Sequence, residues 1–194
     1  FTNLLRTAVL AAVLAPGVFA QQFCWTEMTD NLTVTPGTGV ACTYGAPNNY
    51  TAINEYWRSY NPLARIGAAN FDVLSVTFGV EDATAGLSAP TQPATLNIYR
   101  DPTPGNPAPR ANLVLLGSEV IAIPNQTVSL YTHTFSTPIP ANGLGGDDLV
   151  LMLSIPNGLT LQNRFFFGGN PNGQASPTYL SSSDCGIAEP LACG

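Results

Sequence analysis

Lysine is absent from this 194-residue sequence, and each of its six basic residues is arginine. Charged residues make up only 9% of the chain, compared with about 25% in a typical soluble domain. Twelve acidic residues give a formal net charge of -6. Binding to nucleic acid or to an anionic membrane requires a basic patch that neutralises phosphates, and no basic run occurs here. We therefore expect no nucleic-acid partner and a surface made mainly of neutral polar residues.

Motifs for metal binding and nucleophilic catalysis are equally scarce. The single histidine, His133, lies in YTHTF, and neither a C-x-x-C spacing nor a G-x-S-x-G elbow is present. A nucleophile needs a base beside it, and His133 is the one imidazole available. We interpret His133 as a packed or surface residue and expect no cofactor. A calcium site at Asp147 and Asp148 is a weaker interpretation than a solvated turn, because the D-x-D-x-D-G pattern is missing.

Carboxylates are the remaining candidates for catalysis. Glycoside hydrolysis needs two of them facing each other across a cleft, and nothing in the sequence brings two together. We therefore expect a protein that is not an enzyme. The alternative is a secreted carbohydrate-active hydrolase that uses Glu55 and Asp148.

The longest apolar run lies near the N-terminus. Arg6 is the only charge in the first 26 residues, and the apolar residues 7–20 end in Val18-Phe19-Ala20. This arrangement is typical of a secretory signal peptide. The run is shorter than the 18 to 20 residues, roughly, that span a bilayer, and Pro16 interrupts it. We expect residues 1–20 to be a signal-peptide helix and residues 21–194 to be a single domain, secreted or at the cell surface, with no membrane span.

A filament or pilus-like subunit that keeps its N-terminal segment is the alternative interpretation of this region. Type IV pilins begin with Phe, as this chain does. Their pattern has Glu at position 5, where this sequence has Leu5. The resemblance to pilins therefore stops at one residue.

All four cysteines follow the expected cleavage point, and an even number in an oxidising compartment predicts two disulfides. We favour Cys42 with Cys185 and Cys24 with Cys193, because domain termini often lie close together and long loops constrain the unfolded chain most. The local pairing, Cys24 with Cys42 and Cys185 with Cys193, remains open.

Alternating apolar residues dominate from residue 50 onward. In FDVLSVTFGV, the side chains of Leu74, Val76, Phe78 and Val80 recur with a period of two, which predicts a half-buried strand. Repeated strands near a dozen residues apart predict an all-β antiparallel sandwich, jelly-roll-like or immunoglobulin-like. The predicted strands cover residues 71–80, 94–100, 113–124, 127–140, 148–156 and 163–169.

Three segments give less regular signals. Residues 51–70 are ambiguous, and we favour a strand because their aromatic and threonine content suits a pleated surface. Residues 101–112 contain four prolines and predict a loop. Residues 170–184 predict a long surface loop that holds one edge strand at most.

One aromatic cluster is suited to binding a ligand. Tyr56, Trp57, Arg58 and Tyr60 offer rings and a guanidinium that can stack on a glycan or anchor another surface protein. Neighbouring residues on a strand face opposite ways, so we expect one of Tyr56 and Trp57 to be exposed. The alternative is that one ring packs in the core and the others flank it.

Several segments together resemble a loose family of uncharacterised bacterial β-sandwich modules, secreted or at the cell surface. They are NEYWRSYN, FDVLSVTFGVEDA, ATLNIYR, DLVLMLSIPNG and FFFGGNPNGQASPTYLSSSDCGIAEP, within residues 40–190. The resemblance implies fold and location but no activity. It also implies a further strand after Cys185-Gly186-Ile187, so we expect a fragment truncated at the C-terminus. The expected function is a non-catalytic extracellular module for adhesion, ligand binding or structural support.

The signal-peptide hypothesis predicts where the exported chain begins. Intact mass and N-terminal sequencing of secreted material should show Gln21 as the first residue, because cleavage after Ala20 follows the small-residue rule. Exported protein that still carries residues 1–20 would contradict the hypothesis and favour the filament subunit.

Overall fold

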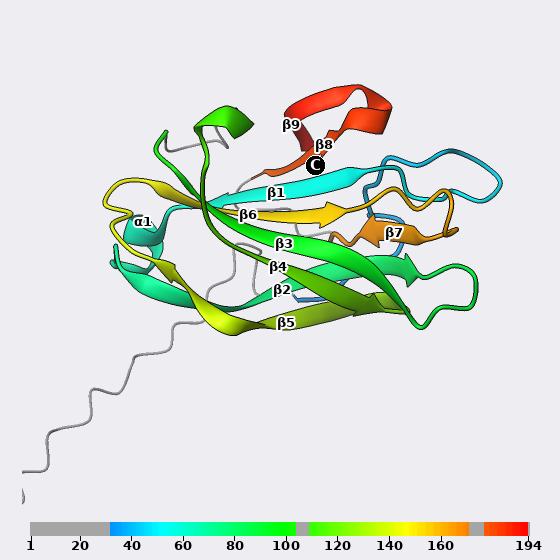
Figure 1. The fold of residues 1–194 in the computed structure, drawn as a ribbon, viewed down its shortest axis with the longest axis horizontal. Helices are drawn as coiled ribbons and strands as arrows, with labels where there is room; N and C mark the ends of the chain where they lie inside the picture. The colour runs from blue at the N-terminus through cyan, green and yellow to red at the C-terminus, as the bar shows by residue number, and fades with distance from the viewer. Residues whose placement is uncertain (1–31, 104–108, 171–176, 194) are drawn as a thin grey trace, which may run out of the picture.

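The computed structural model describes residues 32–103, 109–170 and 177–193. These residues form two antiparallel sheets with one short helix, which confirms the expected all-β sandwich (Figure 1). Residues 1–20 and Cys24 lie outside the described part. In the described ranges, no helix has the length and apolar character needed to cross a membrane. The elements are β1 (Asn54–Tyr60), α1 (Pro62–Ile66), β2 (Phe71–Thr84), β3 (Thr91–Asp101), η1 (Arg110–Asn112), β4 (Val114–Pro124), β5 (Gln126–Ala141), β6 (Asp148–Ile155), β7 (Arg164–Phe167), β8 (Thr178–Ser182), η2 (Ser183–Cys185) and β9 (Ile187–Cys193).

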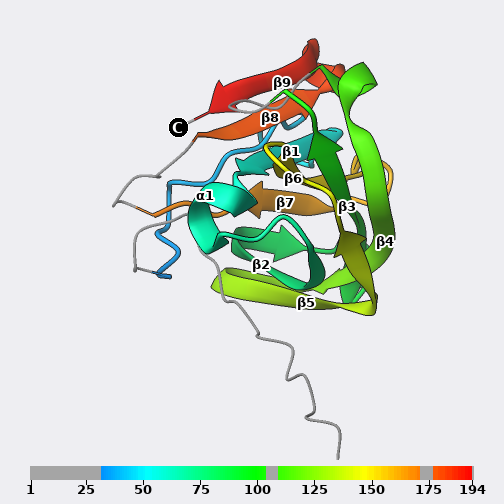
Figure 2. The same ribbon diagram turned by 90° about the vertical axis from the view of Figure 1, so that its left-hand side faces the viewer.

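The two sheets differ in width. The larger sheet has the strand order β4-β3-β6-β1-β8-β9, and the smaller one has the order β5-β2-β7. In the view of Figure 2, β8 and β9 lie at the top of the molecule, and β2 and β5 lie at the bottom. The smaller sheet therefore faces only part of the larger one.

The core lies between the sheets and is built by alternate residues of each strand. Leu96 and Ile98 of β3 are 0% and 1% exposed, as the alternation predicts. Tyr56 of β1 stacks on Phe167 of β7 with ring centroids 4.9 Å apart, which joins the two sheets. Phe165 of β7, which is 0% exposed, also contacts Tyr56, with ring centroids 5.8 Å apart.

A β-bulge changes the expected pattern in β2. Val76, Phe78 and Val80 face the core as predicted, but Leu74 is 43% exposed. The pairing of β2 with β5 shifts register between Val73 and Ser75, and Val73 packs against the core instead. The prediction that Leu74 shares the buried face was therefore wrong.

Residues 51–70 form both a strand and a helix. β1 is the strand that was favoured, and α1 follows it directly. The helix begins where the Asn61 side chain accepts a hydrogen bond from the Ala64 amide at 2.8 Å, with Pro62 in the first turn. Gly67 ends it with a φ of 66°, a conformation that suits glycine.

The prediction of a surface loop over residues 170–184 was wrong at its C-terminal half. β8 pairs with β1 on one side and with β9 on the other, and all five of its residues are buried. Its sequence, TYLSS, contains one leucine and ends in two serines, so its composition does not indicate a strand in the interior of a sheet. The segment Ile187–Cys193 forms β9, the edge of the larger sheet.

Because the bulge in β2 exposes Leu74, the same leucine-to-alanine substitution should destabilise the fold much less at Leu74 than at the buried Leu96. Leu96→Ala should lower the free energy of unfolding by about 2 to 5 kcal/mol, because it leaves a cavity in the core. Leu74→Ala should change it by only about 0.5 kcal/mol, because an exposed side chain loses little on truncation. Denaturant unfolding of both variants checks the difference, and equal losses would place Leu74 in the core.

Candidate functional site

A polar and aromatic cluster lies on the outer face of the larger sheet. Tyr56 faces the core, so its neighbours Glu55 and Trp57 point outward from β1. Glu55 is paired in register with Ser181 of β8, which places the two side chains side by side. Arg110, in η1, reaches this position from the connection between β3 and β4. We call Glu55, Trp57, Arg110 and Ser181 the Trp57 cluster.

The Ser181 hydroxyl is the centre of the Trp57 cluster. It accepts hydrogen bonds from Trp57 Nε1 and from Arg110 Nη2, both at 2.8 Å. It donates to Glu55 Oε2 at 2.7 Å. These contacts use the one donor and both acceptor positions of a hydroxyl, so its orientation is fixed.

Arg110 covers the Trp57 ring. The guanidinium carbon lies 5.2 Å from the ring centroid, within the range of a cation–π contact. An ion pair to Glu55 holds the guanidinium in this position. The Arg110 side chain is 39% exposed, whereas Trp57 is 2% exposed. The group that the cluster presents to solvent is therefore mainly the fixed Arg110 guanidinium, because the Glu55 side chain is only 14% exposed. Tyr99 lies at the flank of Trp57, with ring centroids 5.9 Å apart.

The expected binding residues are mostly internal. Tyr56 is 3% exposed and donates its hydroxyl hydrogen to the Val40 carbonyl, and burial raises the pKa of Tyr56 far above its ordinary value. Arg58 is half-buried and donates to Thr178 Oγ1, and Tyr60 packs against the core. The expectation that Tyr56 or Trp57 is exposed was wrong, because Arg110 covers the outward ring.

The two carboxylates named for hydrolysis lie far apart. Tyr60 pairs with Leu149, so Asp148 is six strand positions from Glu55, a distance of about 20 Å at 3.3 Å per residue. The catalytic pairs of glycosidases are about 5 to 9.5 Å apart. Glu55 and Asp148 therefore cannot act on one bond.

A different carboxylate pair is adjacent in register. Asp101 of β3 is paired with Asp148 of β6. Nothing in the sequence indicated this proximity, because Asp101 and Asp148 are 47 positions apart. Asp101 is 0% exposed and Asp148 is 4% exposed, so neither faces a cleft open to substrate. Asp148 accepts a hydrogen bond from Ser59, and Asp101 accepts two from Thr103.

The neighbouring acid Asp147 forms an ion pair with Arg100. Across residues 32–103, 109–170 and 177–193, no three His, Cys, Asp or Glu side chains are grouped to hold a metal ion. The geometry of these ranges therefore adds no support for calcium at Asp147 and Asp148.

His133 lies at the edge where β4 and β5 meet. Its Nε2 is 3.3 Å from Glu119 Oε1, and its ring contacts Phe135 edge-on. The backbone amide of Ser136 donates to Glu119, and this bond, with smaller help from the Ser136 hydroxyl and His133, lowers the pKa of Glu119. The Glu119 carboxylate lies between the Ser136 hydroxyl and the His133 imidazole. The interpretation of His133 as a packed or surface residue stays a prediction; its side chain is half-buried here.

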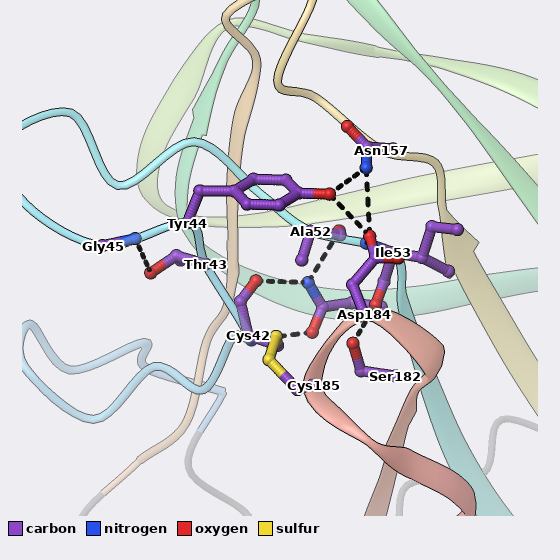
Figure 3. Close-up of a disulfide and its surroundings, with 11 residues drawn as sticks. Cys42, Thr43, Tyr44, Gly45, Ala52, Ile53, Asn157, Ser182, Asp184 and Cys185 are labelled. Atoms are coloured by element: carbon purple, nitrogen blue, oxygen red, sulfur yellow. Dashed lines mark hydrogen bonds between the residues drawn. A yellow bond between two sulfur atoms is a disulfide. The ribbon is translucent and has the colours of Figure 1, made fainter.

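The Cys42–Cys185 disulfide is present, with Cα atoms 6.4 Å apart (Figure 3). It joins the segment before β1 to η2 after β8 and closes a sequence separation of 143 residues. The buried Asn54 side chain accepts from the Cys42 amide and donates to the Cys42 carbonyl. The local pairing of Cys24 with Cys42 is thereby excluded, and the pairing of Cys24 with Cys193 lies outside the described residues.

Asp184 links several segments near the Cys42–Cys185 disulfide through hydrogen bonds. Its carboxylate accepts hydrogen bonds from the Ile53 amide at 3.0 Å, the Tyr44 hydroxyl at 2.8 Å and the Asn157 amide at 3.0 Å (Figure 3). The bond from Ile53, followed by that from Tyr44, lowers the pKa of Asp184 below its ordinary value. Loops that are distant in sequence are therefore held beside the disulfide by one charge.

The chain matches no family model, no curated protein and no solved structure.

The lowered pKa of Asp184 predicts a pH-dependent stability. The carboxylate stabilises the fold at a pH above its unfolded-state pKa of about 3.9, and this contribution is lost as the pH falls through the lower folded-state pKa. In Asp184→Asn, the deficit in melting temperature relative to the wild type should be largest above pH 4, roughly, and should vanish under more acidic conditions. Asp72→Asn, at an exposed position of β2, is the control. A deficit that is constant with pH would contradict the assignment.

Proposed function

We propose that the chain is a non-catalytic β-sandwich module that acts outside the cytoplasm in adhesion, ligand binding or structural support. Location is supported by the Cys42–Cys185 disulfide, since such bonds persist in oxidising compartments and are rare in the cytosol. The resemblance to bacterial surface modules points the same way.

The observation that carries the binding function is the geometry of the Trp57 cluster. Arg110 is held over a buried indole by Glu55 and Ser181, so its guanidinium is ordered before any partner arrives. An ordered polar group loses little conformational entropy when it binds. The Arg110 guanidinium, whose side chain is 39% exposed, offers several hydrogen-bond donors in a planar arrangement suited to hydroxyl oxygens, so a glycan is the preferred ligand class. The second candidate partner is another surface protein, which pull-downs can detect.

A non-catalytic role is supported by how the candidate catalytic groups are used. Glu55 holds Arg110, and Glu119 holds His133 at the sandwich edge. Asp101 and Asp148 are adjacent but buried. Each of these side chains has a structural contact in the place where a catalyst would present a reactive group to solvent.

Glycan arrays and pull-downs with the wild type and Arg110→Ala test this function. The wild type should bind, and Arg110→Ala should bind at least about tenfold more weakly, as expected for a central arginine of an interface. Arg65→Ala, at an exposed position of α1, should bind like the wild type. Circular dichroism and melting temperature establish that each variant is folded.

Two outcomes would contradict the proposal. If Arg110→Ala bound the ligand as tightly as the wild type, the Trp57 cluster would not be the binding site. Hydrolysis of a polysaccharide by the wild type, lost in Asp148→Asn, would establish the hydrolase instead.

A further inference from the structure

Asparagine followed by glycine is a chemically reactive pair. The backbone nitrogen of the glycine can attack the side-chain carbonyl carbon of the asparagine, because glycine has no Cβ to hinder the approach. The pair occurs at residues 142–143, 157–158 and 172–173. The last of these lies outside the described residues. The other two differ in how the fold holds them.

Hydrogen bonds engage both residues of the pair Asn157-Gly158. Asn157 Oδ1 accepts from the backbone amide two residues further on at 2.9 Å. Its Nδ2 donates to the Tyr44 hydroxyl and to Asp184. The Gly158 amide donates to the Thr51 carbonyl at 2.8 Å. The attacking nitrogen and the side chain that it would attack are therefore both held in place.

The pair Asn142-Gly143 begins the connection from β5 to β6, near α1 at the left of Figure 1. The Asn142 side chain is exposed and forms no hydrogen bond to a described residue. The Gly143 amide donates to Asn70 Oδ1 at 2.8 Å. This bond must open before the Gly143 nitrogen can lose its proton and attack, because the proton is held between the two atoms. Only one of the two reactive groups is therefore restrained.

We propose that Asn142-Gly143 is a site of spontaneous deamidation in the folded protein and that Asn70 is a positioning residue that sets its rate. The Gly143 nitrogen loses its proton and forms a bond to Asn142 Cγ. The bond from Cγ to Nδ2 breaks, and the nitrogen leaves with the proton as ammonia. Water then opens the resulting succinimide at one of its two carbonyls, which gives isoaspartate or aspartate. The reaction needs no oxidant, reductant or cofactor.

The place of this pair in the fold gives the modification a consequence. Leu144, the next residue, is 1% exposed in the core, and its amide donates to the Ala69 carbonyl at 3.1 Å. Isoaspartate inserts one methylene into the backbone between β5 and Leu144, so the connection no longer fits its anchor. The connection joins the smaller sheet to the larger one. Modification should therefore loosen the contact between the sheets at this end.

Peptide mapping of the purified full chain tests the site without any variant. Folded protein is incubated at mildly alkaline pH, and each peptide is assayed for the mass gained when NH2 is replaced by OH. An isoaspartate-specific methyltransferase labels the isoaspartate product. Asn142 should be modified faster than Asn157. A rate at Asn157 equal to or above that at Asn142 would overturn the proposal.

Substitutions of Asn70 test its role. Asn70→Ala should raise the rate at Asn142 by about fivefold, the factor that corresponds to the net contribution of one hydrogen bond. Asn70→Asp keeps an oxygen acceptor at the same position and should restore the slow rate. The rate at Asn157 should be the same in all three proteins. An unchanged rate at Asn142 in Asn70→Ala, or an equal acceleration at Asn157, would contradict the assignment of Asn70.

Hydrogen exchange checks that Asn70→Ala acts locally. The Gly143 amide should exchange faster in this variant, whereas residues 94–100 in β3 should exchange at the wild-type rate. Melting temperatures of aged protein test the consequence. The wild type should lose stability with age, and Asn142→Gln should not, because glutamine would have to form a larger ring. Equal losses in the two proteins would overturn Asn142 as the site that loosens the connection.

Discussion

The unequal width of the two sheets is the constraint from which the rest of the structure follows. Six strands face three, so the larger sheet carries an inner face that no strand of the smaller sheet can cover. The excess lies at β8 and β9, because β4 and β5 meet at the opposite side. There the segment around Val40 and Cys42, joined to η2 by the disulfide, takes the place of a missing strand. The disulfide is thus part of the sandwich architecture as well as a constraint on the unfolded chain.

The two side edges of the sandwich are closed by different chemistry. On the β4–β5 side, the chain itself passes between sheets, and Glu119 contacts His133 across the junction. Glu119 is paired in register with the buried Leu96, so it points toward the inner side of an edge strand. An inward charge at an edge discourages pairing with another chain. On the β7–β9 side, covalent and hydrogen-bonded ties around Asp184 do the equivalent work.

Local pattern predicted most of the fold. The period of two located six strands because their inward residues, such as Leu96 and Ile98, are consistently apolar. β8 escaped detection because its buried positions include Ser181 and Ser182, whose burial depends on partners from β1 and the segment before it. Leu74 was misplaced because a bulge is set by pairing with β5 and leaves no mark in the composition of β2. Burial and bulges that depend on the pairing between strands cannot be predicted from the residue pattern of a single strand.

Dependence on contacts between distant segments also explains why the sequence indicated the region of the candidate site but not the contacts within it. The sequence indicated that Tyr56 and Trp57 face opposite ways on a strand but not which ring faces outward, and the burial of Trp57 depends on Arg110, 53 positions away. Charges are few in this chain, and three ion pairs within the described residues join different strands or loops: Arg100 with Asp147, Arg164 with Asp82, and Arg110 with Glu55. Such pairs fix geometry more than they add stability, because partly exposed ion pairs are weak. Because these ion pairs hold strands and loops together, the Arg110 guanidinium is fixed over Trp57 while its side chain stays 39% exposed.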